Sequence, residues 1–447
     1  MKVYFLRRLL LVPLTMLGVT FLVFTITRVM PGSPIQRQMQ EAATASMDGG
    51  SGGGGGGALD EEQIEELERE FMYDKVIPIA YLQWLGVIPR ERLHSQAEFT
   101  EGGEERVGGS IIDDYETEVA VTLSGSGRQV KVVRSGGDMK SAEYLDGDEI
   151  DDDGWNVRIE TPDDRKEVWA RRNDKESADC PKDYDHRAVV FKTRFSGLLQ
   201  GDLGRSTEFG DPVLSLILDR IPIALYFGIL TALITYGVCL PLGVLKAIKH
   251  RTMLDNVTSI LIFLGYSIPG FALGAVLLVY MGARAHWFPL VGLTSPDFDS
   301  MSSLAKIKDV LWHTVLPLSC YVIGSFAWMT MMMKNNLMDN LAADYVRTAV
   351  AKGVDFKKAV FRHAFRNSFI PIATSLGQLI TLVVSGSLLI ETVFDIQGFG
   401  LLQYRGIIES DQMVIMGTLT IAAFLMIMGN ILSDVIVAMI DPRVKFQ

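Results

Sequence analysis

The 447-residue sequence lacks the motifs that would identify it as an enzyme. It contains no Gly-x-x-x-x-Gly-Lys-[Ser/Thr] sequence, so it is not expected to bind ATP through a phosphate-binding loop. Its histidines form no His-Glu-x-x-His pair, which argues against a membrane-embedded protease. A Gly-x-Ser-x-Gly match occurs at Gly49–Gly53, but it belongs to a glycine-rich run that is typical of a flexible linker. The sequence therefore predicts no catalytic residue and no cofactor.

Cysteine is also scarce, with three residues that are far apart in the sequence. Cys239 and Cys320 lie in apolar runs and are expected to be small core hydrophobes, whereas Cys180 stands alone in an acidic segment. An odd, scattered set of cysteines provides neither a disulfide framework nor the spacing of a metal site. No metal site is therefore predicted from the cysteines.

Charge is unevenly distributed along the chain. The formal net charge is −11, but segment 31–215 is strongly acidic and the remainder of the chain is net basic. Two segments of opposite sign indicate two different environments.

Long apolar runs are abundant. A membrane-spanning helix needs about 20 mostly apolar residues, because the hydrocarbon core is ~30 Å thick. Six stretches qualify: Leu9–Met30, Ile221–Ala247, Val257–Met281, Leu311–Met333, Ser368–Ile390 and Met413–Ile440. The first is expected to be retained, because its apolar run is too long for a signal peptide and no clear cleavage site follows it. Ionisable residues are almost absent from the runs, which argues against a proton-coupled transporter.

The basic residues that flank these stretches predict their orientation. Clusters of Lys and Arg precede the first stretch, separate the second from the third and the fourth from the fifth, and follow the sixth. All four clusters fall on one side, which the positive-inside rule assigns to the cytoplasm. Both termini are therefore expected to be cytoplasmic, whereas 31–215 and 391–411 are expected to face outside.

The basic segment Asp344–Pro371 is predicted to form a helix, a glycine break at Gly353 and a second, amphipathic helix. In the first helix Tyr345, Ala349 and Lys352 share a face. In the second, the expected apolar face consists of Val360, Phe361 and Phe365, with Lys357, Arg362 and Arg366 around it. Such a helix could lie on acidic lipid or dock in the groove of a partner protein.

This segment resembles the coupling loop of ABC importer permeases of the dipeptide and oligopeptide family. The residues that carry the resemblance are Arg347-Thr348-Ala349, Gly353, Asn367 and Pro371. In that family the loop sits in a cleft of the cytoplasmic ATPase and transmits its closure to the membrane helices. The resemblance implies this role for Asp344, Tyr345, Arg347, Ala349, Gly353, Arg362 and Asn367.

Other segments are similar to the same family. They are Phe5–Leu10, Met30–Pro34, Gly201–Gly204, Glu391–Phe394, Gly398–Gly400 and Asp441–Arg443. Gly265–Pro269 and Asp297–Ser300 look closest to the Yej-type peptide permease. Most of the chain outside the acidic segment is therefore covered by the resemblance.

The resemblance implies an all-α polytopic protein of the bacterial inner membrane, with six transmembrane helices in a type I ABC importer permease. It would form half of a pathway for peptides. Its partners would be a second permease subunit, cytoplasmic ATPases, an extracytoplasmic substrate-binding protein and the lipid bilayer, but no nucleic acid. Ser385, Gly386 and Ser387 are expected to line the pathway, because small side chains leave room. The alternative is a membrane scaffold or sensor whose inserted domain is the functional part.

The acidic segment is expected to contain an inserted β-rich domain, because alternating apolar residues and turn signals recur between 87 and 193. Strands are predicted around Val119–Leu123, Val130–Val132, Trp155–Ile159 and Val189–Phe191, and an amphipathic helix over Asp60–Phe71 follows a glycine-rich linker. Glu149–Gly154 with Glu160 partly matches a calcium loop, but an acidic hairpin turn is the simpler interpretation. The expected divisions are 1–34, 35–86, 87–193 and 212–441, with the coupling loop at 339–367.

Overall fold

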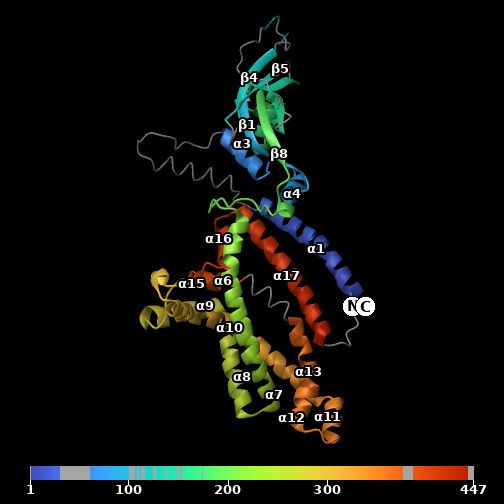
Figure 1. Cartoon of the computed structure of the whole chain (residues 1–447), viewed down its shortest axis with the longest axis vertical. Coiled ribbons are helices and arrows are strands. Elements are labelled where there is room, and N and C mark those ends of the chain that lie inside the picture. Colours follow the sequence, from blue (N-terminus) through green and yellow to red (C-terminus); the bar gives the residue numbers. More distant parts are fainter. Residues whose placement is uncertain are drawn as a thin grey trace. The chain divides into compact units, whose positions relative to one another are not determined.

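The computed structural model describes residues 2–30, 61–99, 106–107, 110–111, 116–123, 127–135, 138–146, 148, 150, 154–173, 175–375 and 386–440. The chain divides into two compact units (Figure 1). The membrane unit comprises Met1–Pro34 and Leu203–Gln447, and the inserted unit comprises Ile35–Asp202. Each unit has a hydrophobic core of its own.

The membrane unit is helical. Its helices are α1 (Lys2–Val29), α6 (Val213–Ile234), α7 (Leu240–Ile248), α8 (Met253–Tyr266), α9 (Gly270–Leu277), α10 (Ser303–Ala342), α11 (Asp344–Ala351), α12 (Phe356–Ala359), α13 (Phe365–Ser368), α15 (Leu388–Phe394), α16 (Phe399–Ile408) and α17 (Gln412–Ile440). Wider, π-helical turns occur at Thr235–Cys239, Leu278–Arg284 and Val360–Ala364.

Four helical stretches in the described part of the chain are long and apolar enough to cross a membrane: Arg8–Val29, Val213–Ile248, Ser303–Ala342 and Gln412–Met439. Large apolar side chains are exposed on them, as expected for helices that face lipid. The predicted stretch Ser368–Ile390 runs through 376–385, which lie outside the described residues. The count of six spans therefore stays a prediction.

The third predicted stretch is broken. Met253–Tyr266 and Gly270–Arg284 together would make a fifth span, but they meet at a bend of 88°. Pro269 precedes the first residue of α9. Because proline has no backbone N–H and restricts the residue before it, one continuous helix over Val257–Met281 is disfavoured at this point.

The helices of the membrane unit pack at close range. Gly243 of α7 lies so near α10 that an added Cβ would be 2.7 Å from the Cβ of Met333 and 2.8 Å from the carbonyl oxygen of Thr330. Helix α1 packs along α17 (Figure 1), and Arg8 pairs with Asp434 there. A second contact region joins α6, α10 and α15 through Phe227, Leu316, Cys320, Tyr321, Ile390, Phe394 and Ile396.

The inserted unit combines short helices with antiparallel sheets. Its elements are α3 (Glu61–Glu70), α4 (Ile77–Leu85), β1 (Arg90–Glu98), β2 (Arg106–Val107), β3 (Ser110–Ile111), β4 (Glu116–Thr122), β5 (Gln129–Ser135), β6 (Asp138–Tyr144), β7 (Trp155–Glu160), α5 (Pro162–Asn173) and β8 (Arg187–Arg194). One sheet has the order β1-β8-β7, another β4-β5-β6, and β2 pairs with β3. The predicted β-rich insertion is confirmed. Strands β1, β2, β3 and β6 and helices α4 and α5 were not predicted.

The alternation of side chains along the strands determines which residues form the core of the inserted unit. Alternate residues of β5 are buried, because side chains of a strand point to opposite faces. Residues of both three-stranded sheets form the core: Phe99, Val121, Leu123, Val130, Val132, Tyr144, Ile150, Trp155, Ala188 and Val190. The amphipathic helix predicted over Asp60–Phe71 corresponds to α3, with Ile64 and Phe71 buried.

A buried arginine joins α3 to the sheet of the inserted unit. Arg187 is 2% exposed and donates to Glu65 Oε2 at 2.7 Å through Nη2 and to Glu160 Oε2 at 3.0 Å through Nε. Arg158 also pairs with Glu160, at 2.9 Å. Glu160 is the residue that would complete the calcium-like pattern, and two arginines occupy it here. Glu149 and residues 151–153 of that pattern lie outside the described residues.

Candidate functional site

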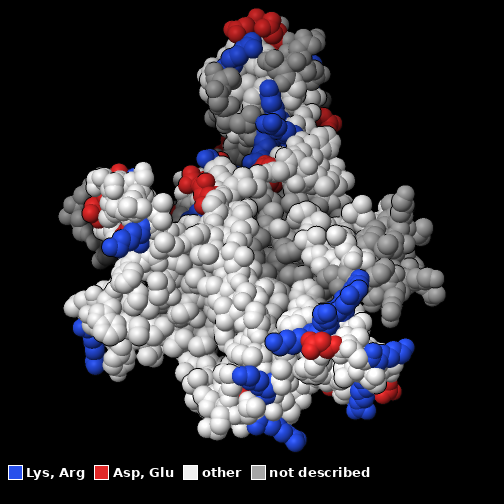
Figure 2. Space-filling model, turned by 60° about the horizontal axis from the view of Figure 1, so that its bottom comes forward, with Lys and Arg blue, Asp and Glu red and all other residues white. Residues whose placement is uncertain are grey.

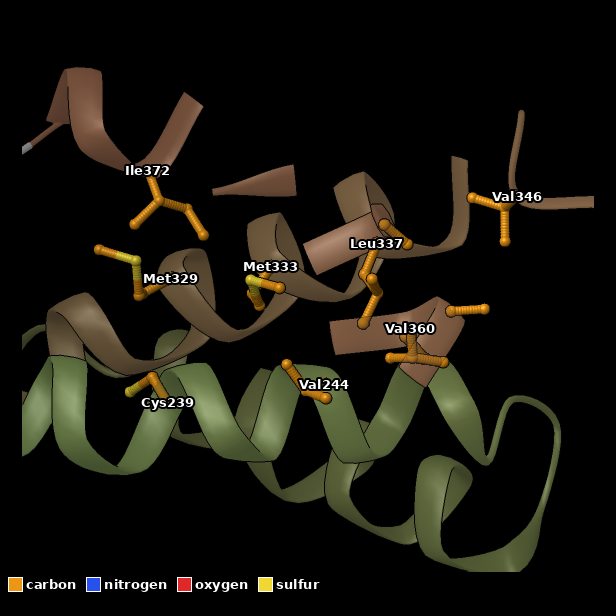
Figure 3. Close-up of a cluster of buried hydrophobic side chains, with 11 residues drawn as sticks. Cys239, Val244, Met329, Met333, Leu337, Val346, Val360 and Ile372 are labelled. Atoms are coloured by element: carbon orange, nitrogen blue, oxygen red, sulfur yellow. The ribbon is translucent and has the colours of Figure 1, made fainter. Parts of the chain in front are cut away.

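The segment α11–α13 rests on a buried apolar floor supplied by α7 and α10. Figure 3 shows this floor, with Met329, Met333 and Leu337 on one ribbon and Cys239 and Val244 on the neighbouring ribbon. The segment contributes its own buried side chains to the cluster: Val346, Ala359, Val360 and Ala364. Burying each large aliphatic side chain contributes about 1.5–3 kcal/mol, so the segment is firmly attached to the two helices.

Gly353 ends α11 as predicted. Its φ is +89°, a left-handed conformation that glycine adopts without a Cβ clash. Its N–H donates to the carbonyl of Val350 at 2.9 Å, and the N–H of Val354 donates to the carbonyl of Ala349 at 3.1 Å. These bonds satisfy carbonyl groups that the end of a helix leaves free. Asp355 then caps α12 by accepting from the N–H of Lys357.

Two of the predicted loop residues meet in a short hydrogen-bonded chain. Tyr345 OH donates to Asn340 Oδ1 at 2.6 Å, and Asn367 Nδ2 donates to Tyr345 OH at 3.1 Å. The chain joins the end of α10, α11 and α13. Asn340 lies within the predicted loop 339–367 but was not singled out as a site residue, because its role depends on contacts between separate helices.

The apolar face predicted for the second helix is partly wrong. Val360 is fully buried and Phe365 packs against the same cluster, but Phe361 is 58% exposed. The buried positions beside Val360 are instead Ala359 and Ala364. Phe361 and Ala364 lie within a π-helical turn, Val360–Ala364, in which side chains are not spaced by the 3.6-residue period on which the predicted face was based.

The outer side of α11–α13 presents aromatic and charged side chains to solvent. Tyr345, Phe356 and Phe361 are 42%, 50% and 58% exposed. The predicted residues Asp344, Arg347, Gly353, Arg362 and Asn367 are also exposed, and Ala349 is partly buried. Figure 2 shows Lys and Arg around this end of the membrane unit, next to a broad surface without charged side chains. Exposed aromatic residues within a charged surface are typical of a protein interface.

The predicted pathway residues are only partly described. Ser385 lies outside the described residues, whereas Gly386 and Ser387 immediately precede α15 and are half-buried. Gly386 has a φ of +62°, and an added Cβ would collide with Glu391. Glycine is therefore required at this position for two reasons, the backbone conformation and the close approach of a carboxylate.

A buried carboxylate holds this region together. Glu391 is 2% exposed and accepts from Tyr321 OH at 3.0 Å, from the N–H of Ser387 at 3.1 Å and from the N–H of Leu401 at 2.8 Å. It thereby links α10, α15 and the first turn of α16. Sequence analysis used Glu391 only as part of the family resemblance, and its carboxylate role required the tertiary structure.

No group of three His, Cys, Asp or Glu side chains is arranged to hold a metal ion in the portion of the chain that the structure describes. The geometry that stands out is a segment, α11–α13, with one side buried against α7 and α10 and aromatic and charged side chains exposed on the other.

Comparison with known proteins identifies the family. The family of binding-protein-dependent transport system inner membrane components matches residues 239–446. The chain is 39% identical over 249 residues to the inner membrane ABC transporter permease protein YejB of Escherichia coli O157:H7, covering 55% of this chain and 68% of that protein. It is 37% identical, with the same coverage, to the peptidoglycan transport system permease protein YejB of Agrobacterium fabrum.

A third relative is more distant but is covered more completely. The oligopeptide transport system permease protein AppB of Bacillus subtilis is 30% identical over 263 residues, which make up 59% of this chain and 82% of that protein. In all three cases the similarity extends over two thirds or more of the relative. The chain therefore belongs to the family of binding-protein-dependent transport system inner membrane components, the permease subunits of ABC transporters, which are transport components rather than enzymes.

Proposed function

We propose that the chain is the permease subunit of an ATP-driven peptide importer in a bacterial inner membrane. One observation carries the proposal: α11–α13 has a buried side attached to α7 and α10 and an exposed side with aromatic and charged residues. Cytoplasmic ATPase subunits would bind the exposed side. A second permease would complete the translocation pathway, and a substrate-binding protein would deliver peptides from outside.

The attachment of α11–α13 suggests how ATP hydrolysis would drive transport. Closure of the ATPases would displace the exposed side chains of Tyr345 and Phe361. Because Val346 and Val360 are buried against α7 and α10, the displacement would move these helices rather than bend the loop. Close packing transmits small shifts in this way, since packed side chains have little free volume into which they can yield.

The substrate class is inferred from the relatives. One is named for oligopeptide transport and another for peptidoglycan transport, and both substrates contain peptide. Competition for ATP-dependent uptake between trialanine and a peptidoglycan-derived muropeptide would separate the two. Preferential uptake of trialanine would support an oligopeptide importer, whereas exclusive uptake of the muropeptide would restrict the substrate to cell-wall fragments.

The proposed topology has six spans, cytoplasmic termini and an extracytoplasmic segment that includes the insertion at 87–193. Cys180 in the inserted unit is partly exposed, whereas Cys239 and Cys320 are buried. A membrane-impermeant maleimide should therefore label Cys180 in spheroplasts, and the Cys180→Ser variant should not be labelled. A cysteine introduced at the exposed position Lys358 should react only after the membrane is made permeable. Labelling of Lys358→Cys from outside would contradict the topology.

The main test changes the exposed side of α11–α13. Phe361→Asp should abolish recovery of the ATPase with the affinity-tagged chain, because a charge replaces an aromatic side chain at the proposed interface. Leu304→Asp is the matched control, since Leu304 is 80% exposed at the opposite end of α10. ATP-driven uptake should be lost with the first variant and retained with the second. Recovery of a normal ATPase complex with Phe361→Asp would contradict the proposal, and absence of uptake by wild type would favour a scaffold or sensor.

A further inference from the structure

Three charged side chains from three helices meet in a buried cluster beside the floor of α11–α13. Lys246 of α7 is 0% exposed, Asp255 of α8 is 2% exposed and Lys334 of α10 is 7% exposed. Lys334 Nζ lies 2.7 and 2.9 Å from the two carboxylate oxygens of Asp255. Lys246 Nζ lies 3.1 Å from Asp255 Oδ1.

The α7–α8 side of this cluster is satisfied without Lys334. Lys246 Nζ also donates to the carbonyl of Asp255 at 2.9 Å and to the hydroxyls of Thr258 and Ser259 at 2.8 Å. The N–H of Arg251 donates to Asp255 Oδ2 at 3.1 Å. His250 Nδ1 lies 3.3 Å from Asp255 Oδ2 as well. Asp255 is therefore paired with Lys246 within the α7–α8 hairpin, and Lys334 is the cation that joins this hairpin to α10.

The position of Lys334 makes the link relevant to coupling. Met333 and Leu337, its neighbours on α10, belong to the floor on which Val346 and Val360 rest. Val244 and Ala247, which flank Lys246 on α7, belong to the same floor. The apolar floor thus ties α11–α13 to α7 and α10, and the ionic contact joins α8 to α7 and α10.

Stability alone does not require this arrangement. Replacing buried ions by well-packed apolar residues of similar volume is often neutral or stabilising, because desolvation offsets much of the Coulomb attraction. An ionic contact does, however, fix the relative position of two helices, because charge and hydrogen-bond geometry allow few alternative partners. Such a contact suits a place where two helices must move together.

We propose that Lys334 and Asp255 are positioning residues that make α8 move with α10 and α11–α13 during transport. The inference rests on the proposed function, in which α11–α13 receives the motion of the ATPases. Helix α8 continues through the 88° bend into α9, and Gly274 of α9 lies against Phe394 of α15. The Lys334–Asp255 contact would thereby carry the motion from α10 to α8, α9 and the contact region at α15.

The sharpest test is Lys334→Met in the intact transporter purified from its own membrane with its ATPases. Methionine approximates the lysine stem, and Asp255 stays paired with Lys246. ATP hydrolysis and uptake of radiolabelled trialanine are measured together in proteoliposomes that contain the binding protein. We expect hydrolysis within twofold of wild type but at least fivefold less trialanine imported per ATP. Lys249→Met, which removes an exposed lysine next to the same hairpin, should leave the ratio unchanged.

The amount of trialanine imported per ATP hydrolysed distinguishes a positioning role of Lys334 from a purely structural one. Loss of folded protein would reduce hydrolysis and uptake in proportion, so an unchanged ratio in Lys334→Met overturns the proposal. If that variant does not assemble, Lys334→Gln provides a second test: its amide can still donate to Asp255 but carries no charge, so less trialanine should be imported per ATP than by wild type, and an unchanged ratio overturns the proposal. Failure of both variants to assemble would make the cluster a folding element and would also overturn the proposal. Absence of uptake by wild type would instead reject the proposed function.

Discussion

Acidification should destabilise the inserted unit through one buried histidine. The side chain of His94 is 15% exposed, and its ring stacks on Phe191 with the centroids 5.8 Å apart. Burial, reinforced by the positive charge of Arg69, lowers the pKa of His94 from 6.5 to about 4. The neutral imidazole is therefore the form that the folded unit accommodates.

The sign and the size of the effect follow from this pKa. Between pH 6.5 and about 4 the unfolded chain binds a proton at His94 that the folded chain does not bind. The free energy of unfolding should therefore fall as the pH falls through this window, by about 1.4 kcal/mol per pH unit. Relative to pH 7, the free energy of unfolding should be lower by about 2 kcal/mol at pH 5 and by roughly 3 kcal/mol near pH 4.

The paired carboxylates of the inserted unit lose their contribution to its free energy of unfolding at a lower pH than His94 does. Burial raises the pKa of Glu160, but Arg187, Arg158 and Arg69 outweigh that effect and hold it below its ordinary value of 4.5. A carboxyl whose pKa is lowered in the folded state contributes stability that is lost only as the pH falls below the ordinary value. Comparison with a variant that cannot titrate at position 94 isolates the contribution of His94 between pH 7 and 5.

Hydrogen exchange on the full chain in detergent can measure this loss. Buried amides of β8 should exchange about thirtyfold faster at pH 5 than at pH 7, after correction for the intrinsic rates, if they exchange through unfolding of the unit. His94→Phe preserves an aromatic ring against Phe191 but cannot titrate, so it should show no such dependence. Equal pH dependence in wild type and His94→Phe would refute the reasoning.

Three further substitutions test the packing of the membrane unit through the thermal unfolding of the purified chain. Glu391→Gln turns one acceptor into a donor next to the N–H of Leu401 and should cost about 2 kcal/mol; an unchanged unfolding temperature would contradict the role of the carboxylate. Gly243→Ala should cost about 1–3 kcal/mol through overpacking, whereas Gly324→Ala, with no atoms within 4 Å of an added Cβ inside α10, should stabilise by about 0.5–1 kcal/mol. Gly353→Ala should cost about 1–2 kcal/mol from its left-handed backbone alone, and a stabilised variant would show that the backbone had rearranged.

The local features of this protein could be read from the sequence because they depend on neighbouring residues. Apolar runs of sufficient length indicated the spanning helices, and period-two alternation indicated strands such as β5, which the structure contains. Gly353 was recognised as a helix end, because only the backbone of one residue had to be considered. The proposed coupling role of α11–α13 came from the resemblance around Arg347 and Gly353, which also lie close together in the sequence.

The features that depend on tertiary structure could not be read in this way. The contact between Lys334 and Asp255 joins residues 79 positions apart, and that between Arg187 and Glu65 joins residues 122 positions apart. A hydrophobic period shows which side of a helix or strand is buried, but it does not show which element covers that side. The choice of partner for a buried charge depends on how the helices and strands pack together, because only packing brings the opposite charge within reach and removes the water that would otherwise replace it.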